Sequence, residues 1–203
     1  LYRRHAQSQI MALTGSALLV VRKSSKTRID LYRRLRQEGC TLLCYEDSED
    51  ADFDCFDHWI IGDIFTNEAA FNTIVLATQH LGVKITGVVS YDEFGVCLAS
   101  YLSERLQLPG LPRAMTEICR HKPRFRTFCE QNGISGPRHR TLSRVDDVDV
   151  VNLRFPAVFK PRAGAGSHFV RKVRDRGELR EAMAWAHQTA PSLTAAPSTL
   201  PPP

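Results

Sequence analysis

The sequence lacks any apolar run of the roughly 18 residues that a membrane-spanning helix needs. It also lacks a Cys-x-x-Cys pair: its 6 cysteines stand apart, and no group of cysteines and histidines has the spacing of a zinc site. The basic start, residues 1–5, is not followed by the apolar stretch that a secretory signal requires. We therefore expect a cytoplasmic protein with reduced thiols and no membrane partner.

The composition sets wide limits on size and ligands. The chain has 203 residues, of which 43% are hydrophobic, enough for one large or two small domains. Its formal net charge of +5 is compatible with an anionic ligand or a nucleic-acid surface. The acidic stretch 46–57 does not have the spacing of an EF-hand loop, and we interpret it as a solvated loop rather than a metal site.

Short apolar runs alternate with helical patterns in the first half of the chain. We predict helices over the segments 28–38, 68–81 and 93–106, the last of them capped by Asp92, and strands over residues 17–21, 41–45, 58–61 and 85–90. Such alternation is typical of a parallel, doubly wound α/β sheet. We expect a leader over residues 1–16 and an α/β domain over 17–109. The loop after its first strand, Arg22 to Lys26, has no glycine, which argues against a dinucleotide site there.

The second half begins after a joint rich in turn residues, 108–112. Helical patterns continue through Ile118 and from residue 124 to 131, residues 138–142 form a candidate strand, and the polar segment 143–152 is a short helix or loop. Asp175 is expected to cap a last helix over residues 178–187. We expect a second domain over 110–189 and a disordered tail over 190–203, where Pro, Ser, Thr and Ala dominate.

The stretch Phe155 to Val173 carries the chemistry, and it reads FPAVFKPRAGAGSHFVRKV. An apolar run, 155–159, predicts a strand; Lys160 follows; and a second run, 168–173, predicts another strand beyond a loop of small residues. Gly164 and Gly166 have no Cβ, so backbone N–H groups there can approach an anion closely, and Lys160 adds a positive charge. An ordinary hairpin with a solvated basic tip fits these residues equally well.

Two better-known phosphate motifs do not fit this stretch. A Walker loop places its lysine after the glycines, whereas Lys160 precedes them. A dinucleotide fingerprint needs a third glycine where Phe169 stands.

The stretch resembles the phosphate-binding hairpin of the ATP-grasp family, in which a lysine ends one strand and a flap of small residues follows. A second segment, RHKPRFR from Arg120 to Arg126, resembles the start of the family's grasp module. There an acidic residue usually precedes an ATP-contacting lysine; His121 stands in its place, while Lys122 and Arg126 match. Several residues occur at the spacing found in the family, and their combination is more specific than any one of them. They are Lys122, Gly133, Pro137, Pro156, Lys160 and the residues of the loop.

The resemblance covers residues 17–188 and implies an α/β fold: a doubly wound pre-ATP-grasp domain followed by the first α+β lobe of an ATP-grasp module. It implies that Lys122 and Lys160 bind ATP, at the phosphates or elsewhere on the nucleotide, and it assigns no catalytic residue. It implies that a flap is formed by Gly164, Ala165, Gly166 and Ser167. A second lobe, with the adenine hinge and the Mg²⁺ ligands, normally follows the helix that ends near His187. The sequence has none of it, so we expect a truncated form of a longer ligase.

The family joins a carboxylate to an amine through an acyl phosphate. The segments Tyr91 to Phe94 and Leu108 to Gly110 are similar to the amino-acid ligase branch, which includes carnosine-synthase-like proteins. We therefore expect the ATP-binding part of a carbon–nitrogen ligase whose partners are ATP, a small-molecule carboxylate, such as an amino acid, and an amine.

Two alternatives remain at this stage. The first is a non-catalytic chain that forms a homodimer through its first domain. The second is a nucleic-acid-binding module that uses the arginines of 120–126 and 138–140 with Phe125 and Phe128. We prefer to place these phenylalanines in a helix core, because the sequence has no signature of a nucleic-acid-binding fold.

Overall fold

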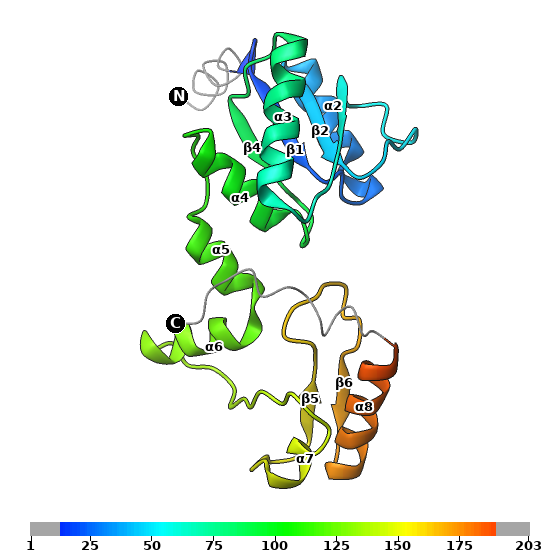
Figure 1. Cartoon of the computed structure of the whole chain (residues 1–203), viewed down its shortest axis with the longest axis vertical. Coiled ribbons are helices and arrows are strands. Elements are labelled where there is room, and N and C mark those ends of the chain that lie inside the picture. Colours follow the sequence, from blue (N-terminus) through cyan, green and yellow to red (C-terminus); the bar gives the residue numbers. More distant parts are fainter. Residues whose placement is uncertain (1–12, 190–203) are drawn as a thin grey trace, which may run out of the picture. The chain divides into compact units, whose positions relative to one another are not determined.

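The structure is a computed structural model that describes residues 13–189. Most of the expected leader and the whole expected tail, 190–203, lie outside the described residues. The chain divides into two compact units, Leu1–Glu117 and Ile118–Pro203, which we call the first and second units (Figure 1). The joint expected at residues 108–112 falls shortly before this division.

A parallel sheet of four strands forms the middle of the first unit. The strands are β1 (Ala17–Val21), β2 (Thr41–Glu46), β3 (His58–Ile61) and β4 (Gly87–Val89), in the order β3-β2-β1-β4. β1 pairs in parallel with both β2 and β4, so the winding of the chain reverses between β1 and β4. This arrangement confirms the doubly wound α/β sheet expected from the sequence.

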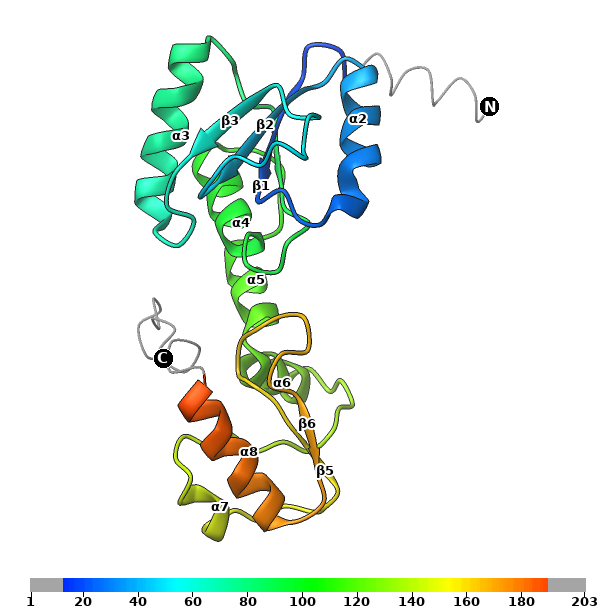
Figure 2. The ribbon, with the colours of Figure 1, turned by 90° about the vertical axis from the view of Figure 1, so that its right-hand side faces the viewer.

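Helices cover both faces of the sheet because neighbouring residues of β1 point to opposite sides. Leu19 and Val21 pack in one core with residues of α3 (Asn67–Leu81) and α4 (Val96–Arg105). Val20 packs in a second core with Tyr32 of α2 (Ile29–Gln37), which follows the 3-10 turn η1 (Lys26–Arg28). Figure 2 shows α2 and α3 on opposite sides of the sheet.

The second unit is built around an antiparallel pair, β5 (Ala157–Phe159) and β6 (Arg171–Val173), in which Ala157 lies opposite Val173. Its other elements are α6 (Lys122–Gln131), α7 (Asp147–Val150) and α8 (Arg176–Thr189); α5 (Arg113–Arg120) crosses the division between the units. The core joins the pair to α7 and α8 through Val148, Val173, Leu179, Ala182 and Met183.

The caps of two helices test the sequence predictions directly. Asp175 caps α8, since its carboxylate accepts a hydrogen bond from the Glu178 N–H at 2.9 Å, as predicted. Asp92 does not stand at the start of α4, because that helix begins at Val96; its carboxylate accepts from the Phe94 N–H in the preceding turn.

The strand predictions in the second unit differ from the structure. The run 155–159 forms a strand only over Ala157–Phe159. The run 168–173 forms a strand only over Arg171–Val173, because Phe169 has a positive φ of 59° and belongs to the turn before it. Residues 138–142, the candidate strand, form neither helix nor strand. Arg138 and Arg140 are exposed, and of the five residues only Leu142 packs against the core of the second unit, so the segment lacks the alternating apolar face of a strand.

The cysteines all lie within the described residues, and none forms a disulfide. Cys119 on α5 is exposed and Cys97 is partly buried, while Cys40, Cys44, Cys55 and Cys129 are buried. Burial raises the pKa of the thiols of Cys40, Cys44 and Cys55, so these side chains are protonated and act as small apolar groups. Within residues 13–189 no helix is long and apolar enough to cross a membrane.

Candidate functional site

The loop between β5 and β6 presents unpaired backbone N–H groups. None of the N–H groups of Gly164, Ala165, Gly166 and Ser167 donates a hydrogen bond to any group within residues 13–189. Positive φ angles shape the loop: 141° at Gly164, 63° at Gly166 and 58° at Ser167. Successive N–H groups in such a turn can converge on an anion, and glycine permits the conformation at low cost.

Lys122, at the start of α6, is attached to this loop at two points. Its backbone N–H donates to the carbonyl oxygen of Arg162 at 2.9 Å, and its ammonium group donates to the carbonyl oxygen of Gly164 at 3.4 Å. Figures 1 and 2 both show the loop beside the first turn of α6. The structure therefore brings together Lys122 and the glycine loop, which stand about forty residues apart in sequence.

Lys160 lies at the other side of the same loop, directly after β5, and its side chain is exposed. It makes no hydrogen bond or ion pair with the residues that the structure describes. An exposed ammonium group at the end of a strand can turn toward a ligand in the loop without breaking an existing contact. The roles of Lys122, Lys160 and the loop in binding stay predictions.

Aromatic contacts hold the far end of the loop against α8. The ring of Phe169 lies 4.7 Å from the ring of Trp185, measured between centroids. The guanidinium of Arg171 lies 3.8 Å from the centroid of the same Trp185 ring. The loop is therefore fixed at its two ends, by Lys122 on α6 and by Trp185 on α8.

His121 connects the site to the first turn of α6. It is the N-cap residue of the helix, and its Nδ1 accepts a hydrogen bond from the Arg124 N–H at 3.3 Å. Burial, followed by the charges of Arg124, Arg162 and Lys122, lowers the pKa of His121. The imidazole is therefore neutral at neutral pH, which leaves the Nδ1 lone pair available for the cap.

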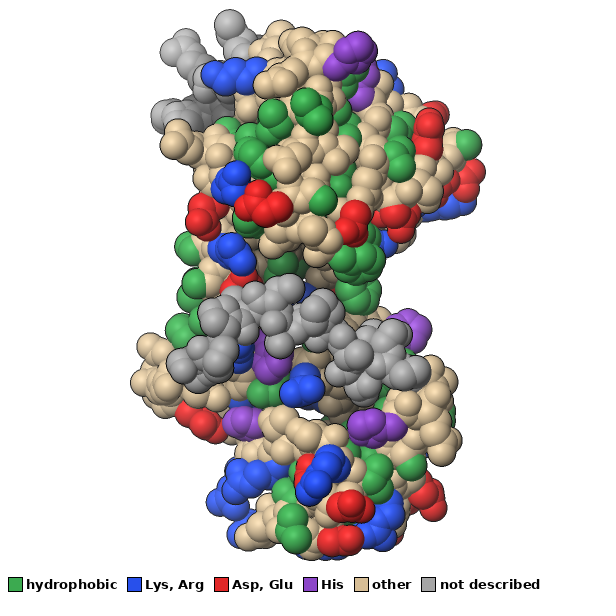
Figure 3. All heavy atoms as spheres, viewed as in Figure 1, with side chains coloured by type: hydrophobic (Ala, Val, Ile, Leu, Met, Phe, Trp, Pro, Cys, Tyr) green, Lys and Arg blue, Asp and Glu red, His purple; other side chains and the backbone are tan. Residues whose placement is uncertain are grey.

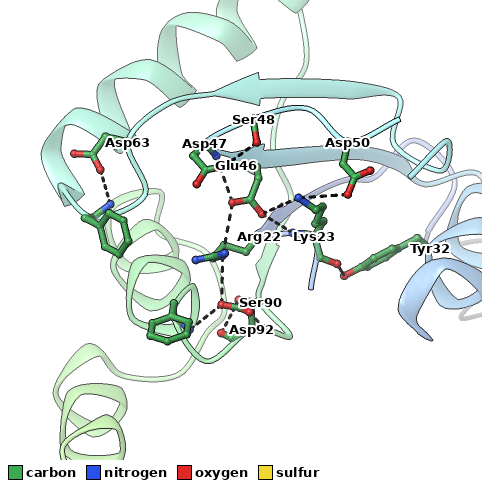
Figure 4. A network of polar contacts seen from close by, with 12 residues as sticks. Arg22, Lys23, Tyr32, Glu46, Asp47, Ser48, Asp50, Asp63, Ser90 and Asp92 are labelled. Atoms are coloured by element: carbon green, nitrogen blue, oxygen red, sulfur yellow. Dashed lines mark hydrogen bonds and ion pairs between the residues drawn. The ribbon is translucent and has the colours of Figure 1, made fainter. Parts of the chain in front are cut away.

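A second polar cluster lies in the first unit, at the carboxyl ends of the strands (Figure 4). Glu46 is only 2% exposed, and its carboxylate lies 3.6 Å from Arg22 Nε and 4.0 Å from Lys23 Nζ. Arg22 Nε is also 3.4 Å from the Asp92 carboxylate, and Lys23 Nζ is 3.6 Å from the Asp50 carboxylate. Two cations thus pair with three carboxylates, and these ion pairs connect the loops after β1, β2 and β4.

The acidic stretch 46–57 is held by ion pairs of this kind. Lys26 pairs with Asp52, Arg33 Nη2 lies 2.9 Å from Asp54, and Arg36 Nη2 lies 2.7 Å from Asp57. Within residues 13–189 no group of three or more His, Cys, Asp or Glu side chains could hold a metal ion.

Charged side chains of both signs are mixed over the visible surface. In Figure 3, blue basic and red acidic side chains are interspersed on both units where the described residues are seen. This face carries no continuous basic stripe of the kind that follows a nucleic-acid backbone.

The architecture is that of roughly the N-terminal half of an ATP-grasp enzyme. The crystal structure of L-amino acid ligase from Bacillus licheniformis matches with a TM-score of 0.70 and 24% sequence identity, over 84% of this chain and 42% of that chain. N5-carboxyaminoimidazole synthetase from Staphylococcus aureus, complexed with ADP, matches with a TM-score of 0.67 and 12% identity, over 84% of this chain and 44% of that one. Phosphoribosylglycinamide synthetase from Anaerococcus prevotii matches with a TM-score of 0.58 and 13% identity, over 86% and 42%.

These likenesses confirm the expected fold, and the chain spans less than half the length of the enzymes it matches. No family model matches the sequence. An uncharacterized protein, y4rH of Sinorhizobium fredii (strain NBRC 101917 / NGR234), is 32% identical over 99 residues, which are 48% of this chain and 21% of that protein.

Sequence reasoning missed the anchor on α8. Leu179, Ala182, Met183 and Ala186 form the buried face of α8. Trp185 lies outside that face and reaches the loop instead, through Phe169 and Arg171. No local signal reveals this contact, because the partners belong to different elements.

Proposed function

We propose that the second unit binds the phosphates of ATP at the loop between β5 and β6. Lys122, Lys160 and the N–H groups of Gly164 to Ser167 would be the binding groups. One observation supports the proposal above all. The ammonium group of Lys122 donates a hydrogen bond to the loop, and the four loop N–H groups have no acceptor within the described residues. Cations and convergent N–H groups are what phosphate oxygens require.

We further propose that this binding serves a carbon–nitrogen ligase. In that reaction a carboxylate oxygen attacks the γ-phosphorus of ATP, and ADP leaves. An amine nitrogen then attacks the acyl carbon, and phosphate leaves. The likeness to L-amino acid ligase supports an amino acid as the carboxylate. The proposal assigns phosphate binding to the described residues and places no metal-dependent step on them, since they contain no group of three or more His, Cys, Asp or Glu that could hold a metal ion.

Thermal unfolding with and without ATP tests the binding. The two tryptophans are Trp59 in the first unit and Trp185 in the second, so the variant Trp59→Phe leaves a fluorescent reporter in the second unit alone. A ligand that binds only the folded state stabilises it by about 2.7 kcal/mol at one hundred times its dissociation constant. We expect ATP to raise the transition temperature reported by Trp185.

Lys160→Ala should weaken ATP binding by about tenfold or more, because a hydrogen bond to a charged group contributes about 1.5–3 kcal/mol. The matched control is Lys84→Ala, which removes the same charge from an exposed position in the first unit and should leave binding unchanged. An unchanged transition at millimolar ATP would refute the proposal and favour the non-catalytic alternative.

A further inference from the structure

We infer that His121 is a further residue of the phosphate site, and that it takes up a proton when a polyphosphate binds. The inference rests on the proposed phosphate site. His121 stands where the ATP-grasp pattern usually has an acidic residue. Its imidazole lies at the start of α6, directly before Lys122.

Cations from α6 and from the loop after β5 act on the imidazole of His121. Lys122 and Arg124 follow it on α6, and Arg162 comes from the loop after β5. The Lys122 N–H donates to the Arg162 carbonyl oxygen at 2.9 Å, which holds the two elements together beside His121. Burial and, after it, the charges of these three cations disfavour the protonated form of the imidazole.

A bound polyphosphate would reverse this balance. Its negative charge would lie against Lys122 and the loop, offset the three cations and attract a fourth positive charge. Protonation breaks the hydrogen bond from the Arg124 N–H to Nδ1, so the cap opposes proton uptake in the free protein. The bound anion favours it, and the pKa of His121 should rise on binding.

The sign of the pH dependence follows from this rise. A site that gains a proton on binding binds its ligand more tightly as the pH falls between its free and bound pKa values. The free value lies below the ordinary value of about 6.5. Affinity should therefore increase from pH 7.5 to 5.5 beyond the change caused by the titration of the ligand itself.

The test uses inorganic tripolyphosphate and the full chain. His121→Asn keeps an N-cap acceptor but carries no charge at any pH, so it separates the helix cap from the proton. For a rise of one pH unit in the pKa of His121, the affinity of the unaltered chain should increase about three- to fivefold more than that of His121→Asn between pH 7.5 and 5.5. By NMR, the His121 ring signal, assigned as the one missing in His121→Asn, should titrate at least one pH unit higher with tripolyphosphate bound.

A second histidine provides the control. His168 lies in the same loop and is exposed, so His168→Asn tests whether it causes the effect instead. The steeper pH dependence should persist in His168→Asn. Lys160-dependent binding with no change in the His121 titration would overturn this inference and leave the proposed phosphate site standing. The absence of any tripolyphosphate binding would overturn both.

Discussion

At the scale of single residues, Gly166 and Gly82 make a matched pair. Both have positive φ, 63° and 65°, in different units. Substitution by alanine should destabilise the unit concerned by about 1–2 kcal/mol, since an L side chain is strained in this region. At Gly166 a Cβ would also lie 3.0 Å from the His168 ring, whereas nothing lies within 4 Å at Gly82.

Only Gly166→Ala should weaken ATP binding, because only that change disturbs the loop that we propose as the phosphate site. Titration calorimetry of both variants measures the affinity, and thermal unfolding measures the stability. Equal loss of affinity in Gly82→Ala would show that general destabilisation, rather than the loop, accounts for the effect.

The sequence predicts the conformational role of a single residue well when that role depends on the residue type alone. Asp175 as a cap and Gly82 after α3 are examples, since a short carboxylate satisfies helix N–H groups and glycine accepts positive φ. The cap formed by His121 could not be predicted, because it depends on a neutral imidazole. The neutral form is favoured first by burial and then by cations from two elements, and both conditions exist only in the folded chain.

At the scale of elements, the loop contacts α8 through the ring of Phe169, which is tilted against the ring of Trp185. Its contact with Trp185 should contribute about 0.5–1.5 kcal/mol, so Phe169→Ala should weaken ATP binding about two- to tenfold as the loop becomes harder to order. Trp185 emission should change in the free variant. The exposed Phe65 of the first unit gives the control, and Phe65→Ala should alter neither quantity.

A comparison of predicted and observed strand bounds shows which of them the sequence alone can predict. β1 and β3 match their predicted bounds, and in β1 the compact apolar run is buried in a sheet covered on both faces. β6 covers only Arg171–Val173 of the predicted run 168–173. Phe169 lies in the turn before it and packs on Trp185. Periodicity reports which residues are apolar, and tertiary contacts decide which of them remain in the strand.

At the scale of the whole molecule, the two units have separate cores. Two cores lie in the first unit, and the core that contains Val148 and Met183 lies in the second. Met183→Ala should therefore cost about 2–5 kcal/mol in the second unit alone, and Leu102→Ala a similar amount in the first.

Urea unfolding followed by the emission of Trp185 and of Trp59, each in a variant that lacks the other tryptophan, separates the two transitions. Met183→Ala should move only the Trp185 transition, and Leu102→Ala only the Trp59 transition. A common shift of both transitions in either variant would mean that the chain unfolds as one cooperative unit.

The uneven burial of the cysteines has a practical chemical consequence. Thiol reagents attack the thiolate, and the thiols of Cys40, Cys44 and Cys55 are both buried and held in the protonated form. Among the six cysteines, all of them described, Cys119 alone is exposed, and it lies on α5 shortly before the helix that bears Lys122. A maleimide dye should therefore couple first at Cys119, which gives the unaltered chain its own attachment point for a fluorescent label.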